Sequence, residues 1–183
     1  MSEVGIVAVG ASAGGPETLK RLFGSIDDLK PAILLAQHNL AGQMEDFARW
    51  LSTVSRKEVK LVLKDEKISG GVVYVPGPGK DLVLKSEKTV GVEDSKGVVA
   101  PNIDTLFHSV ARVLGKKAVV IVLGGLGSDG VLGAVEVVRR GGKVIVQKDA
   151  KFPFLPMNVL KSVRKVSEKT LDEIAVFLQF FAR

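Results

Sequence analysis

Short apolar runs rich in valine, isoleucine and leucine alternate along this chain with amphipathic segments of helical period. The runs of strand length are Val4–Val9, Ala32–Ala36, Val59–Leu63, Ala118–Leu123 and Lys143–Gln147. The segments of helical period are Glu17–Phe23, Met44–Val54, Ile103–Leu114, Val131–Arg140 and Leu171–Phe181. Continuous apolar strands between amphipathic helices are typical of a parallel sheet with both faces covered. The pattern therefore predicts an α/β fold with a doubly wound, mostly parallel sheet.

The pattern changes between residues 72 and 92, where short β-branched runs stand close together. Val72–Val75 and Leu82–Leu84 are separated by Pro76-Gly77-Pro78-Gly79, and Thr89–Val92 follows. Proline and glycine between short apolar runs favour turns, so this stretch predicts a small antiparallel hairpin region. The chain has no internal repeat and no long linker, and residues 1–183 are expected to form a single domain.

Three polar loops follow expected strands: Gly10–Gly15, Gln37-His38-Asn39 and Gly124–Gly130. Ligands of open α/β sheets bind at the carboxyl ends of the strands, above all where the strand order reverses. Because all three loops leave carboxyl ends, we expect the serine, the histidine and the aspartate that they carry to converge on one site.

Ser12 is the candidate nucleophile. Gly10-x-Ser12-x-Gly14 fits the G-x-S-x-G elbow of serine hydrolases, and Ser12 stands where a dinucleotide fingerprint has its second glycine. Each of these short patterns is weak by itself. The backbone N–H groups of Ala13, Gly14 and Gly15, at the start of the expected helix, are candidates to bind an oxyanion.

A serine hydroxyl needs a base, and the chain has two histidines. His38 follows a buried strand and is the candidate base, although a loop histidine can equally be a hydrogen-bonded structural residue. His108 lies within an expected helix, where a structural role is favoured. Asp129 could orient His38, although Asp-Gly is also a common turn pair. The order Ser, His, Asp differs from that of the α/β-hydrolases.

Composition narrows the possible partners and cofactors. The chain has no cysteine, which excludes disulfides and thiolate sites and fits a cytoplasmic location. No metal or other cofactor is expected, because no metal-binding motif occurs. The net charge of +6 suggests an acidic partner, but scattered basic residues and 5% aromatics do not predict nucleic-acid binding. No run approaches the roughly 20 apolar residues that span a bilayer, so no membrane insertion is expected.

Five motifs together resemble the catalytic domain of the chemotaxis protein-glutamate methylesterases, the CheB type. Several motifs in the same order are far more specific than any one of them. The resemblance runs from Val4 to about Gln147, and its motifs are Gly10–Pro16, Gln37–Asn39, Val72–Gly79, Pro101–Phe107 and Gly125–Gly130.

This resemblance implies hydrolysis of glutamate γ-methyl esters on chemoreceptors and deamidation of glutamines. It implies Ser12 as nucleophile, His38 as base and Asp129 as the residue that orients it. It also implies that Ala13, Gly14, Gly15 and Leu126 surround the oxyanion and the substrate. The implied partners are the cytoplasmic helices of methylated receptors. The chain contains no segment like the receiver domain that precedes the catalytic domain in this family, and a stand-alone relative and an excised domain both stay open.

The chain also departs from the family's motifs. Ala13 replaces a threonine, Asn39 and Leu126 replace methionines, and Gln147–Met157 replaces a segment near the expected active site. Two alternatives therefore stay open beside methylester hydrolysis: a catalytically altered receptor-binding or regulatory module, and an esterase with another substrate. Nucleotide binding at the glycine loops ranks last, because the chain lacks the G-K-[ST] of a P-loop.

Overall fold

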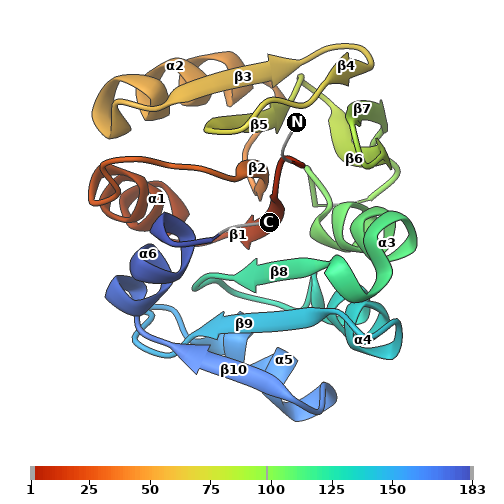
Figure 1. Ribbon diagram of the computed structural model, residues 1–183. Coiled ribbons are helices and arrows are strands. Elements are labelled where there is room, and N and C mark those ends of the chain that lie inside the picture. Colours follow the sequence, from red (N-terminus) through yellow and green to blue (C-terminus); the bar gives the residue numbers. More distant parts are fainter. Residues whose placement is uncertain (1–2, 98, 182–183) are drawn as a thin grey trace.

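Seven parallel strands form the central sheet of the computed structural model, which describes residues 3–97 and 99–181 (Figure 1). Their order across the sheet is β10-β9-β8-β1-β2-β5-β3. The strands are β1 (Ile6–Ala11), β2 (Ala32–Gln37), β3 (Glu58–Val62), β5 (Val72–Pro76), β8 (Val119–Val122), β9 (Lys143–Gln147) and β10 (Val166–Lys169). The predicted doubly wound α/β fold is confirmed. Of the predicted domain of residues 1–183, residues 1, 2, 98, 182 and 183 lie outside the described residues.

Helices cover both faces of this sheet (Figure 1). One face carries α1 (Gly15–Gly24), α2 (Met44–Ser55) and α6 (Leu171–Gln179), and the other carries α3 (Ile103–Leu114), α4 (Val131–Arg139) and α5 (Phe154–Ser162). Two short 3₁₀ turns are η1 (Ala41–Gln43) and η2 (Gly115–Lys117). Successive strand residues point to opposite faces, so Val7 and Val9 pack with α1 while Ala8 packs with α3. This two-sided burial explains why the inner strands of the sheet are almost continuously apolar.

A second sheet of three antiparallel strands lies against α3. Its order is β4-β7-β6, with β4 (Glu66–Lys67), β6 (Lys80–Ser86) and β7 (Thr89–Asp94). The Leu84 N–H donates to Ser109 Oγ at 2.9 Å and so fixes β6 on α3. The assignment of Val72–Val75 to the hairpin region was wrong: it is β5 of the main sheet, paired in parallel with β2 and β3. An apolar run of this length is compatible with a hairpin strand and with a central strand. Only the strands that pair with it, β2 and β3, distinguish the two.

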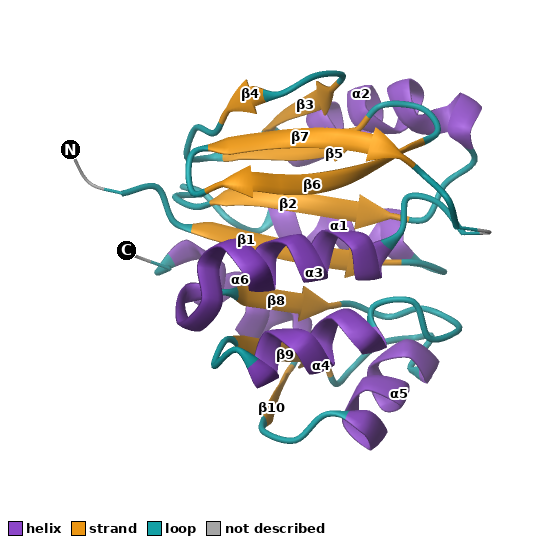
Figure 2. Cartoon of the chain, turned by 90° about the vertical axis from the view of Figure 1, so that its right-hand side faces the viewer, coloured by secondary structure: helices purple, strands orange, loops and turns teal. Residues whose placement is uncertain are grey.

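The strand order reverses beside β1. The chain runs from β1 to β2 on one side and later returns to place β8 on the other side of β1. The loops that follow β1, β2 and β8 therefore leave the same edge of the sheet side by side (Figure 2). This edge is where the fold favours a ligand site.

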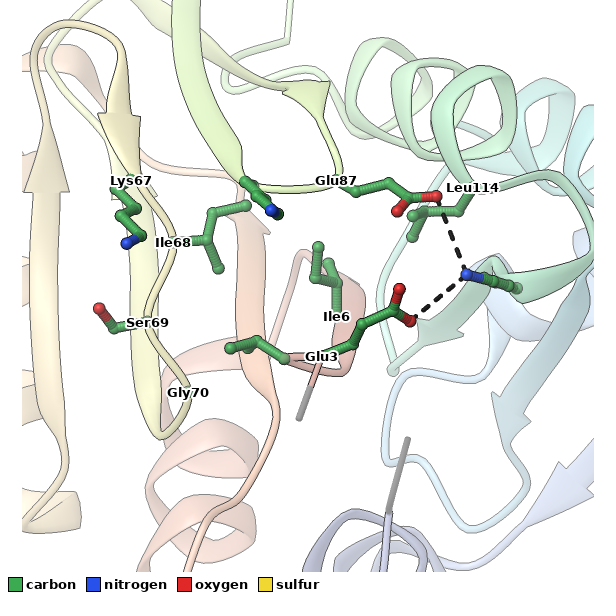
Figure 3. A pocket seen from close by; sticks show the side chains of 11 residues that line it. Glu3, Ile6, Lys67, Ile68, Ser69, Gly70, Glu87 and Leu114 are labelled. Carbon is green, nitrogen blue, oxygen red and sulfur yellow. Dashed lines mark hydrogen bonds and ion pairs between the residues drawn. The ribbon is translucent and has the colours of Figure 1, made fainter. Parts of the chain in front are cut away.

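A cavity of about 620 Å³ lies at the opposite, amino-terminal edge of the strands (Figure 3). Ile6, Ile68 and Leu114 line it, and Lys117 forms ion pairs there with Glu3 and Glu87. This cavity is not the candidate active site, because Ser12, His38 and Asp129 all lie at the opposite edge of the sheet. Within the described ranges, no helix is long and apolar enough to cross a membrane.

Candidate active site

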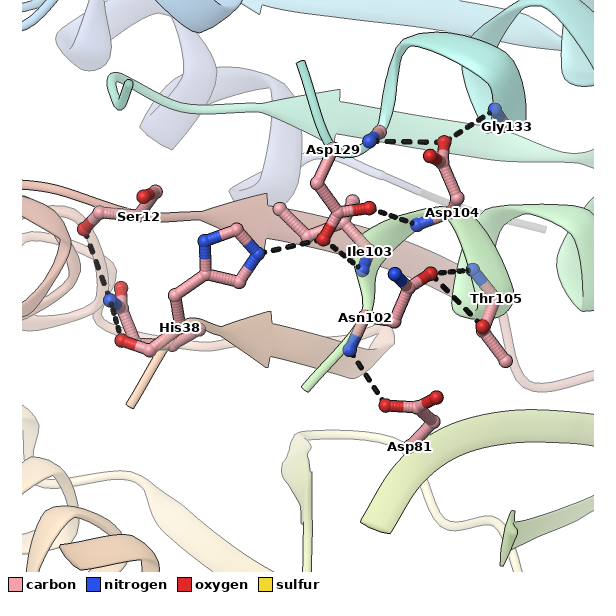
Figure 4. A network of polar contacts seen from close by, with 11 residues as sticks. Ser12, His38, Asp81, Asn102, Ile103, Asp104, Thr105, Asp129 and Gly133 are labelled. Carbon is pink, nitrogen blue, oxygen red and sulfur yellow. Dashed lines mark hydrogen bonds and ion pairs between the residues drawn. The ribbon is translucent and has the colours of Figure 1, made fainter. Parts of the chain in front are cut away.

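The structure brings His38 and Asp129 into direct contact (Figure 4). His38 directly follows β2, and Asp129 stands two residues before α4. His38 Nε2 lies 2.7 Å from Asp129 Oδ2, and the two side chains are only 13% and 12% exposed. His38 therefore has one ring nitrogen committed to the carboxylate, which leaves Nδ1 for another partner.

Ser12 lies on the Nδ1 side of His38 (Figure 4). It directly follows β1, and β1 and β2 are paired up to the register of Ala11 with Gln37. No hydrogen bond joins Ser12 Oγ to His38 among the described residues. Such bonds are often long before substrate binds and tighten in the complex, so the arrangement still fits a nucleophile beside its base.

The turn after Ser12 leads directly into α1. Gly14 has φ +76°, a left-handed conformation that a residue with a Cβ rarely adopts, and the Gly15 N–H donates to the Ser12 carbonyl at 2.8 Å. This bond contradicts the prediction that the Gly15 amide is available to an oxyanion, because closing the turn already uses it. The N–H groups of Ala13, Gly14 and Leu126 donate to no acceptor among the described residues. Leu126 is 50% exposed.

Asp129 also binds the N-terminus of α3. Its Oδ2 accepts from the Ile103 N–H at 2.8 Å, and its Oδ1 accepts from the Asp104 N–H at 2.9 Å. Burial alone would raise the pKa of Asp129, but the hydrogen bonds from His38 and from these two N–H groups hold that pKa below its ordinary value. The carboxylate is therefore kept ionised next to the imidazole.

Asp104 makes the reciprocal contact to α4. Its Oδ1 accepts from the N–H groups of Gly130 at 3.0 Å and of Gly133 at 2.7 Å. Burial raises the pKa of Asp104, and the nearby charge of Asp129 adds to this, although the bonds from Gly133 and Gly130 oppose it. The two aspartates thus cap each other's helices, which fixes the loop that carries Asp129.

Gln37 is a site residue that sequence reasoning missed. The residue is 2% exposed, and its Nε2 donates at 3.0 Å both to the Ser12 carbonyl and to the His38 carbonyl. The amide packs so closely on Gly15 that a Cβ there would overlap Gln37 Oε1. The sequence did contain a signal for this role: Gln37 is a polar residue at the end of a buried strand and directly precedes the candidate base. Its two acceptors were not predictable, because they depend on the pairing of β1 with β2.

The second histidine lies apart from this site. His108 is exposed on α3 and its Nδ1 donates to the Asp104 carbonyl at 2.7 Å. This is a local helix contact, in line with the structural role expected for it. In the ranges 3–97 and 99–181, no group of three or more histidine, aspartate or glutamate side chains could hold a metal ion.

Comparison with known proteins identifies relatives along most of the chain. Residues 7–178 match the family described as CheB methylesterase. A protein-glutamate methylesterase/protein-glutamine glutaminase of Paramagnetospirillum magneticum is 32% identical over 170 residues, which are 91% of this chain and 48% of that protein. One from Pyrococcus horikoshii is 35% identical over 150 residues, which are 78% of this chain and 40% of the relative. The chain thus spans less than half the length of these curated relatives.

A solved structure has the same fold. The crystal structure of the Thermotoga maritima CheB methylesterase catalytic domain superposes with a TM-score of 0.85 at 26% identity, covering 96% of this chain and 97% of that chain.

Proposed function

The chain belongs to the CheB methylesterase family, and we propose that it is a catalytic domain that hydrolyses γ-methyl esters of protein glutamate residues. The observation that carries this proposal is the contact of 2.7 Å between His38 and Asp129, with the free ring nitrogen of His38 on the side of Ser12. The relatives from Paramagnetospirillum magneticum and Pyrococcus horikoshii are named protein-glutamate methylesterases, which supports a glutamate methyl ester as the substrate.

The carboxylate of Asp129 favours one tautomer of His38 in this proposal. An ionised carboxylate is only an acceptor, so the proton of neutral His38 resides on Nε2, where it donates to Asp129. Nδ1 is then the unprotonated nitrogen and the base for Ser12. When Nδ1 takes up a proton, the imidazolium is stabilised by the carboxylate that it already contacts.

In the first half of the reaction, Ser12 Oγ attacks the ester carbonyl carbon as its proton moves to His38 Nδ1. The tetrahedral intermediate then collapses, and the leaving methoxide takes the proton from Nδ1 to depart as methanol. The acyl group remains on Ser12 as an ester of the glutamate side chain.

The second half repeats the sequence with water. His38 Nδ1 takes a proton from water, the hydroxide attacks the acyl carbon, and Ser12 Oγ leaves with the proton from Nδ1. The product is a glutamate carboxylate. A glutamine side chain would follow the same route with ammonia as the leaving group, which is the proposed glutaminase activity.

Backbone N–H groups bind the developing oxyanion in this mechanism. The N–H of Ala13, the residue after the nucleophile, is uncommitted and stands at the N-terminal end of α1, where the helix dipole favours negative charge. Two further N–H groups have no acceptor in the described part of the chain: that of Gly14, in the same loop as Ser12, and that of Leu126, in the neighbouring loop after β8. The proposed substrate proteins are methylated chemoreceptors, the class on which this family acts in chemotaxis.

Ser12→Ala tests this proposal directly. Methanol release from methylated chemoreceptor membranes should fall by several orders of magnitude, because a methyl side chain cannot attack. Ser128→Ala is the matched control, since Ser128 is an exposed serine in the neighbouring loop and should release methanol like the native chain.

A serine-directed phosphonate probe separates the alternatives. Labelling of native Ser12 without methanol release would indicate an esterase with another substrate. Neither labelling nor release would contradict hydrolysis and favour a receptor-binding module.

A further inference from the structure

Helix α5 and the neighbouring loop expose a row of large apolar side chains. Phe154 is 55% exposed, Met157 44% and Leu160 38%, and Leu126 in the loop after β8 is 50% exposed. The helical residues recur every three positions, which places them along one side of α5. Leu155, Pro156 and Val159 form the buried side. We refer to Leu126, Phe154, Met157 and Leu160 together as the apolar ridge.

The ridge is tied by hydrogen bonds to the loop beside the nucleophile. The Gly125 N–H donates to the Phe152 carbonyl at 2.7 Å, and the Leu155 N–H donates back to the Gly125 carbonyl at 2.9 Å. Asn158 Nδ2 donates to the Gly127 carbonyl at 2.7 Å. These three bonds hold α5 and the loop after β8 as one surface.

This surface reaches Ser12 itself. A Cβ on Gly125 would lie 2.7 Å from the Ser12 Cβ, and a Cβ on Gly14 would lie 2.9 Å from the Phe152 ring. α5 stands at the same edge of the sheet as the loops of the candidate site (Figure 2). The ridge therefore lies within reach of a protein segment whose ester is bound at Ser12.

The chain segment that carries α5 is basic. Residues 150–167 contain no aspartate or glutamate, but they contain four cations, all exposed: Lys151, Lys161, Arg164 and Lys165. None of the four forms an ion pair among the described residues. Lys151 instead places its Nζ 5.8 Å from the centre of the Phe152 ring. The charge available to a partner is therefore positive, and the complementary partner is acidic.

We propose that the apolar ridge binds an acidic, amphipathic segment of the substrate protein, next to the glutamyl ester that Ser12 attacks. This inference rests on the proposed function and extends it to the substrate residues that flank the ester. Apolar side chains of the segment pack on Phe154 and Met157, and its carboxylates face Lys151 and Lys161. A second copy of this chain fits the ridge poorly, because a two-fold contact would bring the same basic surfaces together.

Two substrates and a pair of variants test the ridge. One substrate is a peptide with a glutamate γ-methyl ester flanked by glutamates and leucines, and the other is N-acetylglutamate γ-methyl ester methylamide, which is too small to reach the ridge. The double variant Phe154→Ser, Met157→Ser should lower kcat/KM for the peptide about tenfold through KM and leave the small ester unchanged. Val176→Ser is the matched control, because Val176 is 58% exposed on α6 and should change neither.

The charge contribution is tested by Lys161→Glu, which should raise KM for the acidic peptide but not for a version with glutamines in place of the flanking glutamates. Lys116→Glu makes the same charge change at the amino-terminal edge of the sheet and should have no effect on either peptide. An equal rise in KM for the acidic peptide in Lys161→Glu and Lys116→Glu would overturn a local charge contact at the ridge.

Binding of a glutamine-containing peptide, followed by fluorescence anisotropy, separates this inference from the proposed function. Weaker binding to the double variant would support the ridge even if the native chain hydrolysed neither ester, which would overturn only the proposed function. Hydrolysis of both esters with unchanged peptide binding and KM in the double variant would overturn the ridge and leave the function standing. A dimer in solution that the double variant disrupts would assign the ridge to a second copy instead.

Discussion

The carboxylate of Asp129 contacts both a side chain and a helix terminus. Its Oδ2 is shared between His38 Nε2 at 2.7 Å and the Ile103 N–H at 2.8 Å, and its Oδ1 accepts from the Asp104 N–H. The two N–H groups hold the carboxylate in position beside His38. The orientation of the imidazole therefore depends on the N-terminal turn of α3.

Asp129→Asn should lower kcat on the order of 10⁴-fold while KM changes little. The neutral amide cannot stabilise the imidazolium that forms when Nδ1 takes the Ser12 proton, and on either side its NH₂ group would face an N–H donor of α3 instead of accepting from it. The measurement is steady-state methanol release, normalised to the folded fraction seen by circular dichroism.

Asp172→Asn removes the same charge from an exposed side chain on α6 and serves as the control. Full activity of Asp129→Asn would contradict the assigned role of the carboxylate.

The sequence predicted the candidate pair His38 and Asp129 because each follows an apolar strand and carries chemistry that a serine needs. It did not predict the roles of Gln37 and Asp104, because each depends on a hydrogen bond to a residue about 25 positions away in the sequence. Gln37 joins the backbones of Ser12 and His38, and Asp104 binds the turn of Gly130. It also wrongly assigned the Gly15 amide to the oxyanion, because the bond to the Ser12 carbonyl depends on the exact turn.

At the scale of elements, α3 and α4 are linked at their N-terminal ends. Asp129 precedes α4 and binds the first turn of α3, whereas Asp104 lies in α3 and binds the first turn of α4. α3 also has its own cap, since Asn102 Oδ1 accepts from the Thr105 N–H at 2.7 Å. The cap of α3 thus supports the site as well as the fold.

Asn102→Ala and Thr170→Ala should each lower the free energy of unfolding by about 1 kcal/mol, because each removes the cap of one helix. Thr170 caps α6, on the other face of the sheet, in a capping box with Glu173. Only Asn102→Ala should also lower kcat, since the first turn of α3 holds Asp129. Urea titration and methanol release measure the two effects, and equal kcat in both variants would refute the link between the cap and the site.

The elements that were not predicted have identifiable physical reasons. α5 contains Pro156 in its first turn and follows Pro153, and proline ordinarily argues against a helix although the first turn tolerates it. β10 at the sheet edge is polar and only partly buried, so its residues show no apolar run. By contrast, Ile103–Leu114 was predicted with its observed bounds, because it is strongly amphipathic.

At the scale of the whole molecule, the order of strands decides what the loops can form. Periodicity identified most strands of the parallel sheet but could not order them, and so Val72–Val75 was assigned to the hairpin region. β1 stands between β2 and β8, which makes the loops of Ser12, His38 and Asp129 neighbours. The sequence could predict this convergence only as a general property of carboxyl ends.

The stability of the whole molecule should fall on acidification. Hydrogen bonds from Arg139 and Arg140 hold the pKa of Glu136 at about 2, and the pKa of Asp129 is also lowered. A carboxylate with a lower pKa in the folded state stabilises the fold above its unfolded pKa and loses that effect as it is protonated. For Glu136 the loss spans its ordinary 4.5 down to about 2. Urea titrations from pH 7 to pH 2 measure the fall, which Glu136→Gln should reduce.

Asp104 contributes in the opposite sense, because its pKa is raised in the folded state. Its contribution favours the folded state at low pH and is lost as the pH rises through the folded pKa. Asp104→Asn should therefore show a larger fall on acidification than the native chain. A smaller fall would mean that the charge of Asp104 stabilises the fold at neutral pH.

The reciprocal capping by Asp129 and Asp104 also affects which residues indicate that a relative of this chain is still an enzyme. A descendant that gave up hydrolysis would still need the aspartate at position 129 to hold the start of α3, so selection for folding alone would retain it. Ser12 is under no such constraint, because its hydroxyl makes no hydrogen bond among the described residues and only its backbone carbonyl holds the turn. The residue at position 12, rather than an intact aspartate, is the informative sign of whether a relative still acts as an enzyme.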